Sequence, residues 1–454
     1  MMERLPATAR SRIFTVVLFL LFAFCSTPAS FGYSILTHEA IIDAEWDGLI
    51  KASLSRRFPG ATAEQLREAH AYAYGGCVIQ DMGYYPFGSR FFSHLAHYVR
   101  SGDFVSALLA ESGDLNEFAF ALGALSHYVA DNQGHDIAVN RAVPLLYPKM
   151  RNKYGNRMTW EQDPEAHVLT EFGYDVLEVV AMHNAPQTYR DWVGFKVAKP
   201  LLERAFKKTY GLEFSDEFLN VDLTLYMYRK LASQFIPEMT EVAWALRRRE
   251  LENLASGVDH QKMYHLSRKS YLAWRGKYTR PGPVEKLTAF FFRLIPKFGL
   301  LNSFDFHAPT VQTERLFAES LRATILNYDL LLRALNSGGF SPANVNLDTG
   351  RPSQAGEYLH CDLAYAQLLN QLERGHFAGL NPELRDNLLR FYNDPAENAL
   401  QKRPRRWRKV QRELNELEDE SRSEESASQS PPSGQGEKGW ALSDLGQAAT
   451  LAPK

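Results

Sequence analysis

The chain has 454 residues, of which 45% are hydrophobic and 23% charged, and its formal net charge is −2. This charge balance gives no overall attraction to a polyanion, so we expect no stable nucleic-acid partner. Of the three cysteines, only Cys77 and Cys361 lie beyond the amino-terminal segment. At most one disulfide can therefore form in the mature chain, which excludes a small fold built on a disulfide framework.

The amino terminus has the three parts of a secretory signal peptide. A basic segment over residues 1–12 precedes an apolar run over residues 13–25, and small residues follow in STPASFG. The apolar run is too short to cross a bilayer. We therefore expect an exported protein, periplasmic or extracellular. Cleavage after Ala29 and cleavage after Gly32 both fit the pattern.

Apolar residues recur at three- and four-residue intervals through most of the remaining chain, which predicts an all-α fold. No convincing two-residue alternation typical of a strand is present. Turn residues at 85–88, 281–283 and 338–342 separate the helical segments. The clearest helical segments are residues 63–74, 116–131, 164–182, 223–248, 309–335 and 354–372.

Composition divides the mature chain into three parts. Residues 33–190 hold most of the histidines, whereas the helical residues 191–400 carry no comparable cluster and form either the same domain or a second one. Residues 401–454 begin with a basic block and an acidic block and end in Ser, Pro, Gly and Gln. This composition predicts a charged, low-complexity tail that is largely disordered from about residue 420.

One stretch of the second part has an unusual composition. The sequence from Lys286 to Phe304, KLTAFFFRLIPKFGLLNSF, contains five Phe, three bases and no acid. Such a segment suits peripheral contact with a lipid surface, with the bases at the headgroups. A buried core segment is the alternative, and Pro296 would interrupt one continuous helix.

Three candidate ligands follow one another at four-residue spacing in GALSHYVADNQGHD: His127, Asp131 and His135. On a helix this spacing places them along one stripe. Two imidazoles and a carboxylate among Ala, Leu and Val are hard to bury unless a cation compensates them, and zinc takes these ligand types. A core histidine beside an exposed Asp is the alternative. In EAHVLTEFGYDV, His167 and Glu171 repeat the spacing on a second helix.

A metal held by these helices needs further ligands from other elements. Seven of the 13 histidines fall between residues 38 and 167. Asp81, in CVIQDMGYYPFG, is a candidate ligand or else a cap of a helix or turn. His97, in HLAHYVRSGDF, is a candidate ligand or else a core histidine, and His70 is expected to be structural.

These motifs together resemble the zinc-dependent phospholipase C/D superfamily. Its members include bacterial phospholipases C, the amino-terminal domain of glycosylphosphatidylinositol-specific phospholipase D, and nucleases of the S1/P1 type. The resemblance runs from Tyr33 to about Asp175 and includes YSILTH, DMGYYP, AHYVRSGDF, SHYVADNQGH and HVLTE. It implies an all-α phospholipase C/P1 nuclease-like fold with additional C-terminal helices. Tyr33 departs from the Trp typical of the bacterial enzymes, and Gln80 from the Pro of the phospholipase D branch.

The resemblance also implies a cluster of three zinc ions in which His97, and not His94, is a ligand. The first zinc would be held by Asp81, His97, His127 and Asp131. The second would be held by Asp131 as a bridge, by His38, and by the terminal amine and carbonyl of Tyr33. The third would be held by His135, His167 and Glu171.

The number of donors bears on where the signal peptide is cut. Eight side chains are few for three zinc ions at three to four ligands each. A free amine and a carbonyl at Tyr33 would supply two more donors. We therefore expect cleavage after Gly32, with residues 1–32 as the signal peptide.

Phosphodiester hydrolysis fits such a cluster. The enzyme must activate water near neutral pH and neutralise the phosphoryl oxygens, which zinc ions about 3.5–4 Å apart can do. Asp81, a ligand with a spare oxygen, is the candidate catalytic base. We expect an exported zinc-dependent phosphodiester hydrolase, best matched by a phospholipase. A single-strand nuclease, or a non-catalytic exported module with a structural metal cluster, are the alternatives, and an open three-ligand site of His and carboxylate favours catalysis.

Overall fold

The computed structural model describes residues 34–180, 185–241, 243–244, 306–393 and 398–429, and it confirms the all-α fold class. Short 3-10 or π-helical segments carry the label η. The amino-terminal elements are α2 (Ile35–Glu45), η2 (Trp46–Ile50), α3 (Lys51–Arg57), α4 (Ala63–Gly76), η3 (Ile79–Tyr84), α5 (Arg90–Tyr98), α6 (Ser101–Glu111), α7 (Leu115–Gln133), η4 (Gly134–Val139), α8 (Asn140–Leu146), α9 (Pro148–Tyr154) and α10 (Pro164–Val180). The later elements are α11 (Gln187–Val193), α12 (Lys199–Tyr210), η5 (Phe214–Glu217), α13 (Val221–Lys230), η6 (Leu231–Phe235), α17 (Val311–Ser337), β1 (Val345–Asn346), β2 (Arg351–Pro352), α18 (Leu359–Arg374), α19 (Pro382–Tyr392), η9 (Ala399–Lys402) and α20 (Pro404–Gln429).

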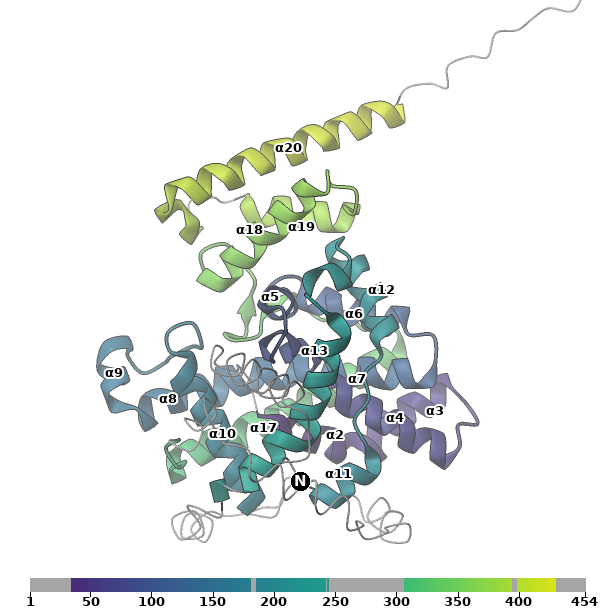
Figure 1. Ribbon diagram of the computed structural model, residues 1–454, viewed down its shortest axis with the longest axis vertical. Helices are drawn as coiled ribbons and strands as arrows, with labels where there is room; N and C mark the ends of the chain where they lie inside the picture. Colours follow the sequence, from purple (N-terminus) through teal and green to yellow (C-terminus); the bar gives the residue numbers. More distant parts are fainter. Residues whose placement is uncertain (1–33, 181–184, 242, 245–305, 394–397, 430–454) are drawn as a thin grey trace, which may run out of the picture.

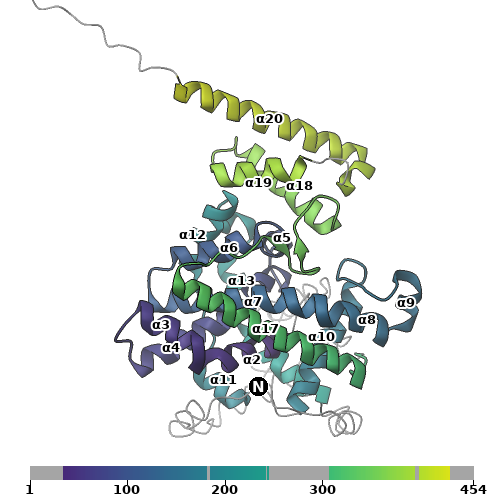
Figure 2. The same cartoon turned by 180° about the vertical axis from the view of Figure 1, so that it is seen from behind.

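Helix α7 lies at the centre of the body, where it packs along α4 and also contacts α2, α6 and α17 (Figures 1 and 2). Two glycines let α4 and α7 approach closely. A Cβ atom at Gly123 would lie 2.2 Å from the Ala73 carbonyl oxygen, and one at Gly76 would lie 2.0 Å from the Phe120 carbonyl oxygen. Only a residue without a side chain fits such contacts between backbones, so these glycines set the helix spacing.

Side-chain caps define where helices α5 and α7 begin. Asp114 accepts a hydrogen bond from the Glu117 amide at the start of α7. Ser89 does the same for the Phe92 amide at the start of α5. Each cap satisfies one of the amides that a first helical turn leaves without a partner. Helices α5 and α7, which together carry three of the predicted ligands, are therefore fixed at their amino ends by local sequence.

One cluster of buried apolar side chains extends from α2 to α20, so the helices after residue 190 share a core with those before it. Helices α18, α19 and α20 lie at one end of the molecule, where α18 packs against α5 and α20 (Figures 1 and 2). Cys77 and Cys361 are both buried and free. The described part of the chain has no helix that is long and apolar enough to cross a membrane.

The structure differs from the sequence expectations at two places. A short antiparallel hairpin, β1–β2, follows α17, and its two-residue strands are too short to show an alternating pattern. Helix α20 continues to Gln429, beyond residue 420, from which the composition predicts a disordered tail. Strong helix formers and an ion pair between Arg412 and Glu416 one turn apart favour the helix.

Three expectations fall outside the described residues. They are the signal peptide with Tyr33, the stretch from Lys286 to Phe304, and the tail from residue 430.

Candidate metal centre

Helix α7 and the π-helical turn η4 that continues it supply three of the predicted ligands. His127 and Asp131 lie one turn apart on α7, and His135 is the second residue of η4. All three side chains are buried. Along this stripe they belong to two adjacent groups, because His127 and Asp131 face η3 and α5 whereas His135 faces α10.

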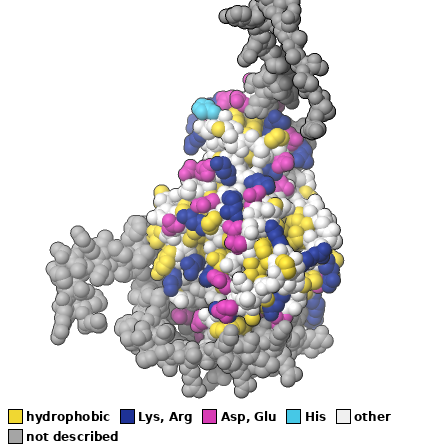
Figure 3. Space-filling view, turned by 90° about the vertical axis from the view of Figure 1, so that its right-hand side faces the viewer, with side chains coloured by type: hydrophobic (Ala, Val, Ile, Leu, Met, Phe, Trp, Pro, Cys, Tyr) yellow, Lys and Arg dark blue, Asp and Glu magenta, His cyan; other side chains and the backbone are white. Residues whose placement is uncertain are grey.

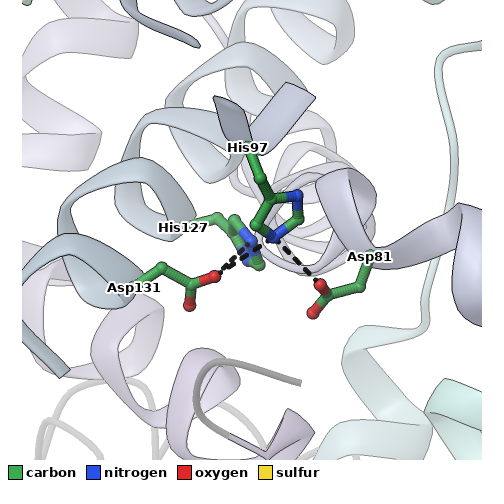
Figure 4. A group of neighbouring side chains, drawn as sticks. All are labelled: Asp81, His97, His127 and Asp131. Carbon is green, nitrogen blue, oxygen red and sulfur yellow. Dashed lines mark ion pairs between the residues drawn. The ribbon is translucent and has the colours of Figure 1, made fainter. Parts of the chain in front are cut away.

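The first group consists of Asp81, His97, His127 and Asp131, and one ligand atom from each lies within 4.8 Å of all the others (Figure 4). Nε2 of His97 lies 3.3 Å from Asp81 Oδ1 and 3.3 Å from Asp131 Oδ2. Nε2 of His127 lies 3.1 Å from the same Asp131 oxygen. Four donors from three elements (η3, α5 and α7) thus point at one place.

The second group consists of His135, His167 and Glu171, which are all buried. Nε2 of His167 lies 2.8 Å from Glu171 Oε1, and Nε2 of His135 lies 3.5 Å from the same oxygen. His167 and Glu171 lie one turn apart on α10, in the four-residue spacing seen in the sequence. This group offers three protein ligands, which is the number that leaves a position open for water or substrate.

His38, on α2, lies beside the first group. Its Nε2 is 3.4 Å from Asp131 Oδ1, and its ring stacks on that of His127 with centroids 4.6 Å apart. Asp131 therefore presents Oδ2 to His97 and His127 and Oδ1 to His38. A carboxylate with its two oxygens on different partners has the geometry of a bridging ligand.

Asp175 positions the helix that carries His38. This α10 residue accepts hydrogen bonds from the amides of Leu36 and Thr37, at 2.9 and 3.1 Å, and from the Thr37 hydroxyl at 2.7 Å. The contacts cap the first turn of α2, for which Ser34 provides no side-chain cap. Burial raises the pKa of Asp175 to about 6 against the opposing effect of these donors. One helix, α10, thus carries two predicted ligands and the cap of α2.

The orientation of three histidines is fixed by backbone carbonyls. Nδ1 lies 2.8 Å from the Ser93 oxygen in His97, 3.0 Å from the Cys77 oxygen in His127, and 3.0 Å from the Leu347 oxygen in His135. A carbonyl only accepts, so each Nδ1 must carry the proton and each Nε2 keeps its lone pair in the neutral ring. This is the arrangement by which proteins hold a metal-binding imidazole.

The charge of the two groups requires a cation. Both oxygens of Asp81, Asp131 and Glu171 are buried and lack hydrogen bonds, as do Nε2 of His127 and of His135. Three such carboxylates carry a desolvation cost of several kcal/mol each unless a positive charge compensates them. A donor set of imidazole nitrogen and carboxylate oxygen is the one that zinc prefers. The residues present therefore fit bound zinc.

Neighbouring charges outweigh burial in the pKa values of Asp131 and His135. Burial alone would raise the pKa of Asp131, but the attraction of His127 and the close contacts with the Nε2 atoms of His127, His38 and His97 hold it well below its usual value. Burial would likewise lower the pKa of His135, yet Glu171, Asp131 and Asp348 raise it to about 9. Asp131 and His135 are thus held toward their charged forms by neighbours of opposite sign, whereas burial and the neighbouring His127 lower the pKa of His38.

The structure brings every predicted ligand that it describes into this centre, namely His38, Asp81, His97, His127, Asp131, His135, His167 and Glu171. His94 lies one turn from His97 and faces away, among the rings of Tyr98, Trp160 and His360. Sequence reasoning missed Asp348, whose Oδ1 lies 3.4 Å from His135 Nδ1. No helical spacing links it to the centre, since it comes from the turn between β1 and β2.

Residues 37–220 match the family model described as zinc dependent phospholipase C. The matched segment contains all eight of the predicted ligands that the structure describes. It confirms the resemblance over this part of the chain and the enzyme class, a zinc-dependent phosphodiester hydrolase. No curated protein and no solved structure matches the chain.

Proposed function

We propose that this protein, whose residues 37–220 match the zinc-dependent phospholipases C, is an exported hydrolase of phospholipids or other lipid-linked phosphodiesters that binds three zinc ions. The observation that carries the proposal is the pair of adjacent buried ligand groups, with Asp131 directed at both His38 and the first group. Their three carboxylates carry three negative charges, so a single zinc ion would leave one of these charges uncompensated and one of the two groups without a cation.

Each ion has its own residues in this proposal. Asp81, His97, His127 and Asp131 hold the first, and His135, His167 and Glu171 hold another. His38 and the second oxygen of Asp131 contribute to the remaining one, together with the amine and carbonyl of Tyr33 once the signal peptide is removed. Asp175 supports this last site because it fixes the first turn of α2, which begins two residues after Tyr33.

The chemistry of the site is in-line attack of water on a phosphodiester. Bound zinc supplies Lewis acidity, which activates water near neutral pH and neutralises charge on the phosphoryl oxygens. Oδ1 of Asp81 lies 3.3 Å from Nε2 of His97, so Oδ2 is available to take the proton of the attacking water. The carbonyls behind His97, His127 and His135 keep the Nε2 atoms aimed at the reaction centre.

Three features favour a lipid over a nucleic acid as the substrate. The DMGYYP element and the short gap between Asp131 and His135 resemble the phospholipase D branch of the superfamily. The chain has a net charge of −2, and on the face shown in Figure 3 basic and acidic side chains are interspersed. A polyanion would find no continuous positive surface on that face. The stretch from Lys286 to Phe304 has the composition of a lipid-contacting segment.

The test compares substrates on one zinc-loaded preparation. Mixed micelles of phospholipid, a soluble chromogenic phosphodiester and single-stranded DNA are assayed at equal enzyme and near-physiological salt. We expect the lipid to be cleaved fastest, and Asp81→Asn to abolish turnover while the protein still binds metal. Faster cleavage of DNA, with a rate that falls steeply as salt rises, would assign the protein to the nuclease branch.

A second variant tests the lipid contact by itself. Phe291→Ala combined with Phe292→Ala should lower the rate on micelles and leave the rate on the soluble diester unchanged. Equal losses on both substrates would assign these residues to the protein core.

A further inference from the structure

A turn from the later part of the chain contacts the metal centre, although it lies more than 120 residues beyond the family match at residues 37–220. This segment, residues 345–350, consists of strand β1 and the turn that connects it to β2. The Leu347 amide donates a hydrogen bond to the His97 carbonyl at 3.0 Å. The Leu347 carbonyl accepts one from His135 Nδ1, also at 3.0 Å. A single residue thus joins a histidine of the first group to a histidine of the second.

Asp348 adds a buried charge beside His135. Its side chain is about 4% exposed, and Oδ1 lies 3.4 Å from His135 Nδ1. Oδ2 accepts hydrogen bonds from the hydroxyls of Tyr98 and Tyr358, at 2.9 and 2.6 Å. The carboxylate is therefore held between two hydroxyls on one side and an imidazole on the other.

The backbone of the turn is fixed as well. Asn140 Nδ2 donates to the Asp348 carbonyl at 2.6 Å, and the Asp348 amide donates to Asn346 Oδ1 at 2.9 Å. The Ser101 hydroxyl accepts a hydrogen bond from the Val345 amide of β1 at 3.1 Å and donates one to the Val345 carbonyl at 2.6 Å. Because helices α5, α6 and α8 all contribute to this framework, the turn can hold the imidazole ring of His135 in one orientation.

We propose that residues 345–350 form the outer shell of the metal site made by His135, His167 and Glu171, and that Asp348 is a positioning residue for His135. The proposal rests on the zinc-binding function proposed above and extends it to a part of the chain outside the family match. A carboxylate behind a metal-binding imidazole fixes the proton on Nδ1 and makes Nε2 a stronger donor. The helical region after residue 191 then contributes to metal binding as well as to the fold.

The experiment measures zinc affinity of the full-length mature protein by competition with a chromogenic chelator. Loss of an outer-shell partner lowers metal affinity about 10- to 100-fold. We therefore expect Asp348→Asn to weaken one zinc by this factor and to leave the other zinc ions at wild-type affinity. Tyr358→Phe, which removes one donor to Asp348 and keeps the carboxylate, should cause a smaller loss at the same zinc.

Asp362→Asn is the matched control. Asp362 is also a fully buried acid of this region, and it accepts hydrogen bonds from the amides of Gly356 and Ala399 at 3.0 and 2.7 Å. These two contacts of its carboxylate involve neither His135 nor another predicted ligand. The substitution should lower stability and leave all zinc affinities unchanged. If both Asn variants weaken zinc equally, Asp348 acts only through the fold and the proposal is wrong.

Two further outcomes keep the experiment decisive. Wild-type affinity for every zinc in Asp348→Asn overturns the positioning role. Should that variant fail to fold, Tyr98→Phe and Tyr358→Phe together replace it, and wild-type affinity in this double variant overturns the role equally. Since the readout is metal binding, a protein that binds zinc normally but does not cleave lipid would contradict the proposed substrate and not this inference.

Discussion

The two histidines of helix α5 should give opposite results when each is replaced by alanine. His97 and His94 lie three residues apart, but only His97 contacts acidic ligands, with Nε2 3.3 Å from both Asp81 and Asp131. His94 packs among aromatic rings, 5.1 Å from the His360 centroid and 5.5 Å from that of Tyr98. Burial and the nearby His360 lower the pKa of His94 to about 3, so His94→Ala removes a neutral ring at pH 7.

The magnitudes follow from these contacts. His97→Ala removes an interaction partner of two buried carboxylates. At about 1.5 kcal/mol for each carboxylate the loss is about 3 kcal/mol, which corresponds to about a hundredfold lower zinc affinity. His94→Ala creates a partly buried cavity and should cost about 2 kcal/mol of folding stability. Its metal affinity should remain that of the wild type, because the Nε2 atoms of the centre are untouched.

Metal content after dialysis and urea unfolding of the metal-loaded proteins measure the two effects separately. We expect His97→Ala to retain fewer zinc ions and to be inactive, and His94→Ala to retain all of them with a lower unfolding midpoint. Loss of zinc in His94→Ala with normal content in His97→Ala would refute the assignment of the α5 ligand.

Two other predictions concern the amino terminus and the later helices. A chain that begins at Tyr33 should bind one more zinc than a chain with extra residues ahead of Tyr33, as measured by atomic absorption, because only the first has a free amine beside His38; equal zinc content would contradict this. Burial raises the pKa of Asp362 to about 6, so its protonated form stabilises the fold below the unfolded pKa of about 3.9 and this stability is lost as the pH rises through about 6. Between pH 5 and 7 the free energy of unfolding of the wild type, measured in urea, should therefore fall by about 1 kcal/mol relative to that of Asp362→Asn. Parallel pH profiles of the two proteins would contradict the raised pKa of Asp362.

Local patterns explain why much of the fold and of the centre could be predicted. The pairs His127/Asp131 and His167/Glu171 have the spacing of one helical turn, so a helix alone places each pair on one face. Apolar periodicity likewise predicted α4, α7, α10, α17 and α18. Asp81 and His97 required the family resemblance, since neither has a partner at helical spacing.

Long-range contacts explain what the sequence could not show. Leu347 and His135 are 212 residues apart, and a turn of sequence NLDTG is compatible with any exposed connection. The contribution of Leu347 is a main-chain carbonyl, which every residue possesses, so no residue type marks it. The Cys77 carbonyl that holds the His127 ring is likewise not marked by any residue type. The strands of the hairpin have two residues each, which is too few for an alternating pattern.

Helix packing determines where the Cys77 carbonyl lies. Helix α4 ends at Gly76, so the next carbonyl has no helical amide to accept from and receives Nδ1 of His127 at 3.0 Å. That contact depends on the close approach of α4 and α7, in which Gly123 faces the Ala73 carbonyl. Any side chain at Gly123 would push α4 away, and the carbonyl that fixes the His127 ring would move with it. The glycines between α4 and α7 therefore contribute to the metal centre, because they set the position of the carbonyl that holds the His127 ring.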